Sequence, residues 1–583
     1  MSKFSIGVDL GTTNCVMVYT PINEENQKVF MIPQFVDSEV IEARASLPSF
    51  LYLGTDSEAF KLPWQNQPSS KIIGAWARRR ASQVPDRTIA AAKSWLAHSK
   101  IDKRENLLPT NAPEDVDKLS PYAVTCDILS YLVSAWNYAN QEDKFINQDV
   151  VLTVPASFDE VARDLTREAA IEAGFPDNFT ILEEPQAAMY SWLGTKGDTW
   201  RKQLRAGDSL LVVDVGGGTS DFSLIKTVDE EGQLGLKRVA VGKHLLVGGD
   251  NMDLALAHLA AQQFAQGGTS LDPWQNISLW HSCRDAKESL LGDALQDTHT
   301  ISIKGKGRSI IGSSISTQLN KKTVQDFLLN GFFPEVNFDE QVQRASTGFV
   351  QVGLAYESDA AITRHLATFL REHSAEIEGG PTHIIFNGGV FKAAMFQDRV
   401  LNSIEKWLGL RPTVLDSEHN LDISVAQGAS YYAIVRAGNG LRIRGGTSRS
   451  YYLGFETAAM AIPGMPKPMQ GLCVVPRGME EGTSLAIPSE PLGLVVGQRA
   501  TFPFFSSTLR PDDNVGTLLP TITADVEEAD TIVADLPTQG YESGEVVSVK
   551  LEAKLQETGA LELWAISLDG TQRWKFEFNA REE

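Results

Sequence analysis

Two loops of the chain combine the residue types that a metal-bound nucleotide requires. Each loop follows an apolar run that carries an aspartate at its end, Asp9 in one case and Asp214 in the other. The loop residues suited to phosphate contact are Gly11, Thr12, Thr13 and Asn14 in the first loop, and Gly216, Gly217, Gly218 and Thr219 in the second, with Asp221 as a candidate to fix that second loop. Glycine lets backbone N–H groups converge on phosphate oxygens, and Mg²⁺ takes only one or two carboxylates because it keeps several waters. The pattern predicts a site for Mg²⁺ and a nucleoside triphosphate.

Two other kinds of phosphate loop do not fit this sequence. A P-loop needs Ser or Thr after Gly-Lys, but Gly242-Lys243 is followed by His244. A dinucleotide-binding loop needs a helix after its glycines, whereas residues 219–225 alternate like a strand. The three glycines at 216–218 therefore belong to a β-hairpin. One such hairpin could be an ordinary turn, but two loops of the same pattern favour the phosphate site.

The elements that position these loops recur along the chain. A third apolar run, residues 383–386, leads into the turn Asn387-Gly388-Gly389. The first two loops lie roughly 200 residues apart, which indicates a duplicated unit rather than a short-period solenoid. Between them, residues 159–173 have the apolar spacing of an amphipathic helix, beginning with Val161 and ending before Gly174. Strand hairpins that alternate with helices predict an α/β fold.

The composition changes near residue 440, where strands, proline and glycine replace the helical pattern. Near the end of the chain, apolar residues alternate with polar ones over 547–555, 561–563 and 574–578, with turns between them, which predicts a β-meander. We therefore expect a nucleotide-binding domain over residues 1–438, a linker over 439–446 and an all-β domain over 447–583.

Composition limits the class of protein further. The 583 residues include 52 basic and 74 acidic side chains, a net charge of −22, which argues against nucleic acid or an anionic membrane as a general partner. The four cysteines are scattered, so neither a disulfide framework nor a zinc site is expected. Because residues 1–3 lead directly into an alternating run and no long apolar stretch occurs, we expect a cytoplasmic protein.

The arrangement of the loops resembles the actin-like ATPase superfamily, which includes sugar kinases, actins and 70-kDa heat-shock chaperones. Residues 151–158 with Arg163, and the segment 182–188 around Glu184-Pro185, closely resemble the DnaK type of chaperone. Segments 246–253, 283–290 and 420–429 follow in the same order and at similar spacing. The resemblance is strong over 4–438 and weak from 445 to 583. It implies a two-lobed, duplicated, ribonuclease-H-like ATPase domain followed by a small β-sandwich.

The same resemblance assigns roles to single residues. Asp9 and Asp214 would hold Mg²⁺ through its waters, with Asp214 and Thr219 also in the catalytic set. Lys93 matches the family's catalytic lysine, and Glu184 matches the carboxylate that orients or deprotonates the attacking water. Further expected nucleotide contacts are Gly248, Gly249, Lys287, Gly388, Gly389 and Asp422.

Several of these assignments have ordinary alternatives. Lys93 could be a solvated helix lysine, and Glu184 could be an acid at a helix N-terminus. Pro155 and Arg163 match positions that couple the nucleotide state to the peptide-binding domain. They could equally be a strand-end proline and a surface arginine, since coupling cannot be inferred from residue type.

The sequence departs from the family in three places. Glu288 replaces an arginine that stacks on adenine, and Val390 and Lys392 replace a serine and an arginine after Gly-Gly. The linker 441–445 is half basic where the family is apolar and acidic. No helical lid follows the β-domain within the 583 residues. We therefore expect altered binding of the base, altered linker docking and fast release of peptide.

We expect an ATP-hydrolysing, chaperone-like protein that couples turnover of ATP to binding of unfolded polypeptide, with a J-domain co-chaperone and a nucleotide exchange factor as further partners. A small-molecule kinase would need a catalytic aspartate and a polar sugar cleft, which the sequence does not reveal. A scaffold that binds ATP without useful turnover is the non-enzymatic alternative.

Overall fold

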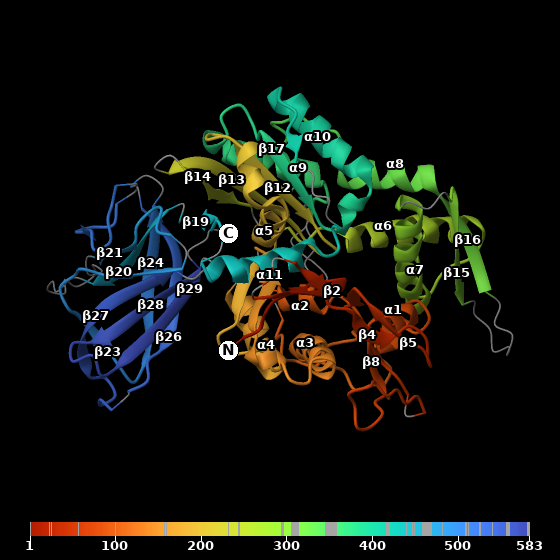
Figure 1. Cartoon of the computed structure of the whole chain (residues 1–583), viewed down its shortest axis with the longest axis horizontal. Coiled ribbons are helices and arrows are strands. Elements are labelled where there is room, and N and C mark those ends of the chain that lie inside the picture. The colour runs from red at the N-terminus through yellow and green to blue at the C-terminus, as the bar shows by residue number, and fades with distance from the viewer. Residues whose placement is uncertain are drawn as a thin grey trace. The chain divides into compact units, whose positions relative to one another are not determined.

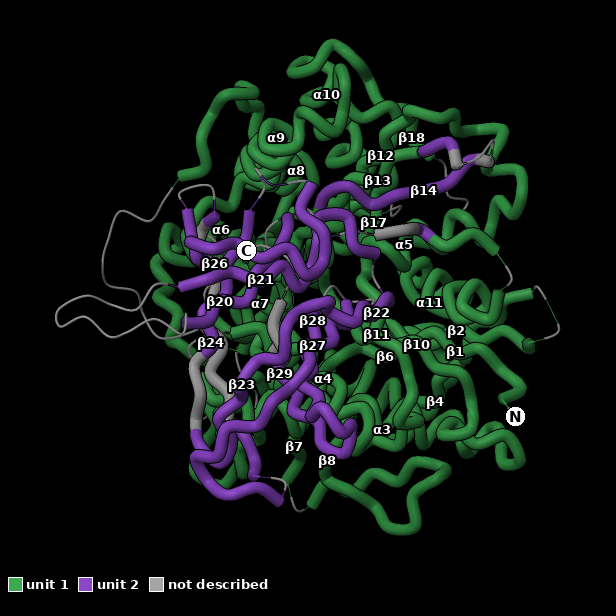
Figure 2. Tube along the Cα trace, turned by 90° about the vertical axis from the view of Figure 1, so that its left-hand side faces the viewer, with its two compact units in different colours: residues 1–227, 241–442 green, residues 228–240, 443–583 purple. Residues whose placement is uncertain are grey.

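The computed structural model describes residues 2–22, 24, 26–55, 57–98, 101–156, 158, 160–230, 233–242, 245–292, 296–304, 314–343, 358–415, 420–438, 440–445, 447, 449–456, 469–480, 482–507, 510, 512–523, 526–538, 540–555 and 560–579. The chain forms two compact units, one of residues 1–227 and 241–442 and one of residues 228–240 and 443–583 (Figure 2). The division into domains that we infer from the sequence, with a boundary at 438, stays a prediction.

The first lobe of the larger unit is built on a sheet with the order β11-β10-β1-β2-β3, in which β6 also pairs with β2. These strands are β1 Phe4–Leu10, β2 Asn14–Pro21, β3 Lys28–Val29, β6 Ser46–Pro48, β10 Asp149–Val154 and β11 Thr180–Glu183. An antiparallel hairpin joins β1 to β2, and β10 lies parallel to β1. Because Ile6 and Val8 are fully buried, β1 is fixed in the sheet and carries Asp9 to its end.

The second lobe repeats this arrangement with a sheet that runs β18-β17-β12-β13. Its strands are β12 Ser209–Val215, β13 Ser220–Glu230, β17 His383–Asn387 and β18 Thr413–Val414. A hairpin joins β12 to β13, and β17 lies parallel to β12, with Asp214 opposite Asn387 in the register. In the first lobe, Asp9 lies opposite Thr153 of β10 in the same way. The duplication predicted from the sequence is confirmed.

Two helices, α5 (Glu184–Lys196) and α11 (Ser424–Arg436), lie side by side between the sheets (Figure 1). α11 packs on β1, and α5 packs on β12. Their close contact depends on Gly428, because a Cβ there would lie 1.7 Å from the carbonyl oxygen of Ala187. The two helices therefore connect the strands that carry the two predicted phosphate loops.

Outer helices cover both lobes (Figure 1). They are α1 Ala75–Ala81, α2 Ala92–Leu96, α3 Pro121–Ala139, α4 Glu160–Glu172, α6 Gly249–Gln266, α7 Pro273–Leu291, α8 Lys321–Phe332, α9 Ile362–Glu372 and α10 Ala394–Leu408. The small sheets contain β4 Ile32–Phe35, β5 Ile41–Arg44, β7 Leu51–Leu53, β8 Lys71–Ile73, β9 Thr88–Ile89, β15 Thr298–Lys304 and β16 Ser314–Asn320. Short 3-10 helices lie at Pro85–Arg87, Phe145–Asn147, Gly197–Lys202, Ser374–Glu376 and Gly389–Lys392. Among the helices that the structure describes, none combines the length and the apolar character needed to cross a membrane.

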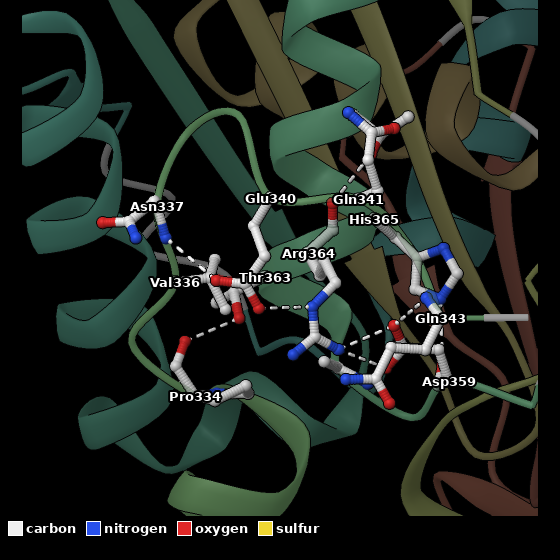
Figure 3. Close-up of polar contacts among 12 residues, drawn as sticks. Pro334, Val336, Asn337, Glu340, Gln341, Gln343, Asp359, Thr363, Arg364 and His365 are labelled. Atoms are coloured by element: carbon white, nitrogen blue, oxygen red, sulfur yellow. Dashed lines mark hydrogen bonds and ion pairs between the residues drawn. The ribbon is translucent and has the colours of Figure 1, made fainter.

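A polar network ties the segment that follows α8 to α9 (Figure 3). The Arg364 guanidinium donates to both carboxylate oxygens of Asp359 at 2.6 Å and to Glu340 at 2.9 Å. Thr363 donates to the carbonyl oxygen of Pro334 at 2.8 Å. These contacts give residues 334–343 and 358–364, to which the sequence motifs assign no role, a structural role.

The smaller unit contains two sheets, with the orders β25-β21-β20-β24-β26 and β22-β27-β28-β29, in which β23 also pairs with β27. The strands are β20 Ser450–Glu456, β21 Met469–Val475, β22 Thr483–Ala486, β23 Leu492–Val495, β24 Arg499–Ser507, β25 Leu518–Leu519, β26 Glu527–Asp535, β27 Val546–Leu555, β28 Ala560–Ser567 and β29 Arg573–Asn579. Residues of both sheets share one apolar core, so the unit is a β-sandwich. The predicted meander is β27-β28-β29. Within the same unit, β19 (Arg444–Gly445), which comes from the predicted linker, pairs in parallel with β14 (Gln233–Val241).

Candidate nucleotide-binding site

A cavity of about 430 Å³ in the larger unit brings both predicted phosphate loops to one place. The predicted residues that line it are Asp9, Gly11, Thr12, Thr13, Asn14, Lys93, Glu184, Asp214, Gly216, Gly217, Thr219, Gly249, Lys287, Gly388, Gly389 and Asp422. Its volume lies within the range of about 300–1,000 Å³ that is usual for small-molecule sites. Gly218 and Gly248 are adjacent in the chain to lining residues but do not line the cavity themselves, and Asp221, two residues after Thr219, does not line it either.

Asp9 and Asp214 are buried carboxylates at equivalent ends of β1 and β12. Burial and the nearby charge of Glu184 raise the pKa of each to about 7, against the opposing effect of Lys93. Thr153 donates to Asp9 at 3.1 Å, and Asn387 donates to Asp214 at 2.7 Å. A raised pKa means that each carboxylate lacks nearby positive charge and binds a proton readily. Two such carboxylates in one cavity suit a divalent cation, which would supply the missing positive charge.

The hydrogen bonds around these carboxylates involve two residues that sequence reasoning missed. One is Thr153, and the other is Ser424. The Ser424 hydroxyl donates to the side-chain oxygen Oδ1 of Asn387 at 2.7 Å and so fixes the orientation of that side-chain amide toward Asp214. Thr153 could have been found from the duplication, since it holds the position in β10 that Asn387 holds in β17. No sequence signal marks Ser424.

Lys93 and Glu184 form an ion pair within the cavity. The Lys93 side chain is only 6% exposed, so its alternative as a solvated surface lysine is wrong. Burial lowers the pKa of the Lys93 ammonium, but the carboxylates of Glu184 and Asp9 more than offset this and leave the pKa raised. Glu184 is the first residue of α5, which agrees with the alternative of an acid at a helix N-terminus. Its side chain nevertheless lies in the cavity, paired with Lys93. The site therefore holds a fixed positive charge beside a carboxylate.

A buried network forms another part of the cavity wall. Arg284 of α7 donates to Asp250 and to Asp253 at 2.8 Å, and Lys287 lies 2.6 Å from Asp253. Lys287 also donates to the carbonyl oxygen of Gly249 at 2.7 Å. Arg284 is 5% exposed and was not among the predicted residues, because its sequence context does not distinguish it from a surface helix arginine.

The phosphate loops leave no room for larger residues at their closest approach. A Cβ on Gly217 would lie 2.2 Å from the Thr13 hydroxyl, and a Cβ on Gly388, whose φ is +87°, would lie 2.2 Å from the carbonyl oxygen of Val215. The glycines thus bring bare backbone to the cavity from two turns of the second lobe. Together with the two carboxylates, this cradle fits a phosphate chain with Mg²⁺.

The family model described as Hsp70 protein matches residues 58–331, a range that contains Lys93, Glu184 and Asp214. Over this range the chain is similar to the Hsp70 family. Among its relatives are two proteins named "Chaperone protein HscA homolog", from Actinobacillus pleuropneumoniae serotype 5b (strain L20) and serotype 3 (strain JL03). Each is 29% identical over 275 residues, which cover 45% of this chain and 38% of the relative. The match thus spans well under half of the relatives' length.

At the end of the cavity where the sequence predicts the base, two charged residues are engaged in ion pairs. Glu288 lines the cavity and lies 2.5 Å from Arg78 of α1. Lys392, also in the lining, lies 2.5 Å from Asp422. Glu288 and Lys392 are therefore each held by an oppositely charged side chain.

Arg163 is buried in an ion pair. It donates to Glu183 and to the carbonyl oxygen of Ala156, both at 3.0 Å, and the two paired side chains are at most 5% exposed. Its alternative as a surface arginine is therefore wrong. Pro155 directly follows β10 and is buried. The coupling role of both residues stays a prediction.

Proposed function

We propose that the chain binds Mg·ATP in this cavity and hydrolyses it to ADP and phosphate. The observation that supports the proposal is the convergence of Asp9, Asp214 and the Lys93–Glu184 ion pair on one cavity lined by two glycine-rich loops. A small-molecule kinase has less support, because the sequence identifies neither a catalytic aspartate nor a polar sugar cleft for it.

In the proposed reaction, the residues of this chain position charge. Asp9 and Asp214 would hold Mg²⁺ through its waters, and the bound ion would supply positive charge beside the phosphates. Lys93 balances the charge that develops on the terminal phosphoryl group. Glu184 accepts a hydrogen bond from the attacking water and then its proton. The loop N–H groups and Thr219 bind the phosphate oxygens.

We further propose that ATP turnover is coupled to the binding of unfolded or extended polypeptide by the β-sandwich. The match to the Hsp70 family model and the chaperone names of the relatives support this coupling. Pro155 and Arg163 are the residues that we propose for coupling, with a J-domain co-chaperone and a nucleotide exchange factor as partners. All four cysteines are free thiols, which supports a reducing compartment such as the cytoplasm.

A single-turnover experiment tests the enzymatic proposal. Hydrolysis of ATP is measured for the wild type, Lys93→Ala and Lys406→Ala, each with and without a labelled unfolded peptide. Lys406 is a suitable control because its side chain is 61% exposed. We expect Lys93→Ala to be slower by about 100-fold or more, and Lys406→Ala to match the wild type. Equally slow hydrolysis by all three, unaffected by peptide, would refute turnover and favour an ATP-binding scaffold.

A further inference from the structure

Ser94 has a buried hydroxyl whose hydrogen-bonding capacity is unused. Ser94 follows Lys93 in α2, and the residue is 4% exposed. Within the described part of the chain, the Ser94 hydroxyl has no hydrogen-bond partner. A helix serine often donates to a carbonyl oxygen one turn earlier, and Ser94 makes no such bond. An unpaired buried polar group is unfavourable by about 1–3 kcal/mol, so it needs an explanation.

The position of this hydroxyl gives one. A Cβ on Gly218, in the second phosphate loop, would lie 2.6 Å from the Ser94 hydroxyl oxygen and 3.3 Å from that of Thr12. A Cβ on Gly217 would meet the Thr13 hydroxyl at 2.2 Å. Three hydroxyls of the first lobe thus face the glycine backbone of the second lobe. Thr12 and Thr13 line the cavity, and Ser94 lies beside them, next to the cavity residue Lys93.

We propose that Ser94 is a further phosphate contact, which donates a hydrogen bond to the terminal phosphoryl group of a bound nucleoside triphosphate. The inference rests on the proposed function, in which Lys93 serves the same phosphoryl group. A serine hydroxyl rotates to suit its acceptor, so the Ser94 hydroxyl can turn toward a phosphate oxygen bound beside Thr12, Thr13 and Lys93, which line the cavity. A diphosphate has no terminal group at this place. Ser94 therefore favours the triphosphate over the diphosphate.

The test compares affinities rather than activity. Isothermal titration of the full chain measures the dissociation constants of Mg·ADP and of a non-hydrolysable Mg·ATP analogue for the wild type and Ser94→Ala. A hydrogen bond to a charged group is strong, so we expect the analogue to bind about tenfold more weakly to Ser94→Ala while ADP changes by less than about twofold. Ser282→Ala is the control, because Ser282 donates within α7 to the carbonyl oxygen of Ser278. We expect it to keep the wild-type ratio of affinities.

Ser94→Cys gives a second measurement if Ser94→Ala is unstable, because it keeps the side chain's shape and has only a weak donor. It should shift the ratio of the two affinities in the same direction. An unchanged ratio in both variants, with tight binding by the wild type, would overturn the role of Ser94 and leave the proposed function standing. A wild type that binds neither nucleotide would overturn both.

Discussion

The Arg78 guanidinium lies 2.5 Å from the Glu288 carboxylate, and this contact joins α1 of the first lobe to α7 of the second. Arg78 also lies 3.2 Å from Asp285, one turn earlier in α7. The nearby acidic groups keep the pKa of Arg78 raised even though burial acts to lower it. Since Glu288 lines the cavity, the ion pair connects the two lobes at the edge of the nucleotide site.

Removing this ion pair should speed nucleotide release. Glu288 is 49% exposed, so its interaction contributes at most about 1 kcal/mol, and Glu288→Gln should raise the release rate of a fluorescent nucleotide by about two- to fivefold. Stopped-flow displacement measures the rate, and high salt should accelerate the wild type similarly by screening. Glu405→Gln, which removes a surface pair with Arg411, is the control. Release that responds neither to the substitution nor to salt would show that the pair does not hold the lobes together.

Loss of Lys93 should destabilise the nucleotide-free protein as well as slow hydrolysis. Lys93→Met would leave the Glu184 carboxylate beside Asp9 and Asp214 without the buried ammonium that now faces them. Breaking one side of a buried pair usually lowers the free energy of unfolding by about 3 kcal/mol. Urea denaturation measures this change, and the double variant Lys93→Met with Glu184→Gln should recover part of it. A double variant less stable than the sum of the two single ones would contradict the pairing.

The raised pKa values of Asp9 and Asp214 predict how stability depends on pH. In the folded protein both values are about 7, whereas an unfolded aspartate has a pKa near 3.9. The folded state therefore binds more protons than the unfolded state between these values, and the free energy of unfolding should fall as the pH rises from about 4 to 7. Thermal unfolding without nucleotide should show this slope. Asp9→Asn with Asp214→Asn should flatten it, and an unaltered slope would exclude these groups as its cause.

Two neighbouring glycines should respond differently to substitution. A Cβ on Gly388 would meet the Val215 carbonyl oxygen at 2.2 Å at a φ of +87°, whereas a Cβ on Gly389 would have nothing within 4 Å. We expect Gly388→Ala to lower the melting temperature and weaken Mg·ATP binding, and Gly389→Ala to keep the wild-type melting temperature. Differential scanning calorimetry of both variants makes the comparison. Equal melting temperatures would rule out the tight turn at Gly388.

The Arg364 network should contribute strongly to stability. Arg364 and Asp359 are 10% and 5% exposed, so Arg364→Met would leave a buried carboxylate unpaired (Figure 3). We expect a loss of about 3 kcal/mol in the free energy of unfolding. Arg411→Met, whose ion pair lies on the surface, should change it by less than about 1 kcal/mol. Urea denaturation measures the free energy of unfolding of both variants. A loss in Arg364→Met as small as that in Arg411→Met would show that the network adds little to stability.

Much of the fold follows from local sequence pattern. The apolar runs at Asp9 and Asp214 predict strands, and the glycines that follow predict hairpins, because both features depend on neighbours in the chain. The same reasoning predicts the terminal meander. It fails where a side chain's type misleads: Val161, expected on the apolar face of its helix, is 52% exposed, whereas Arg163 is buried.

The sequence by itself predicted that two duplicated hairpin loops supply the residues of a phosphate site, and the family resemblance added Lys93 and Glu184. Only the tertiary structure decided how their charges are satisfied. Arg284 with Asp250, Arg163 with Glu183, and Arg78 with Glu288 are pairs whose partners lie on different elements. Charged residues are normally exposed, so their burial depends on a partner that only the folded chain brings within reach. The phosphate loops are a property of the sequence, and the electrostatics of the cavity are a property of the fold.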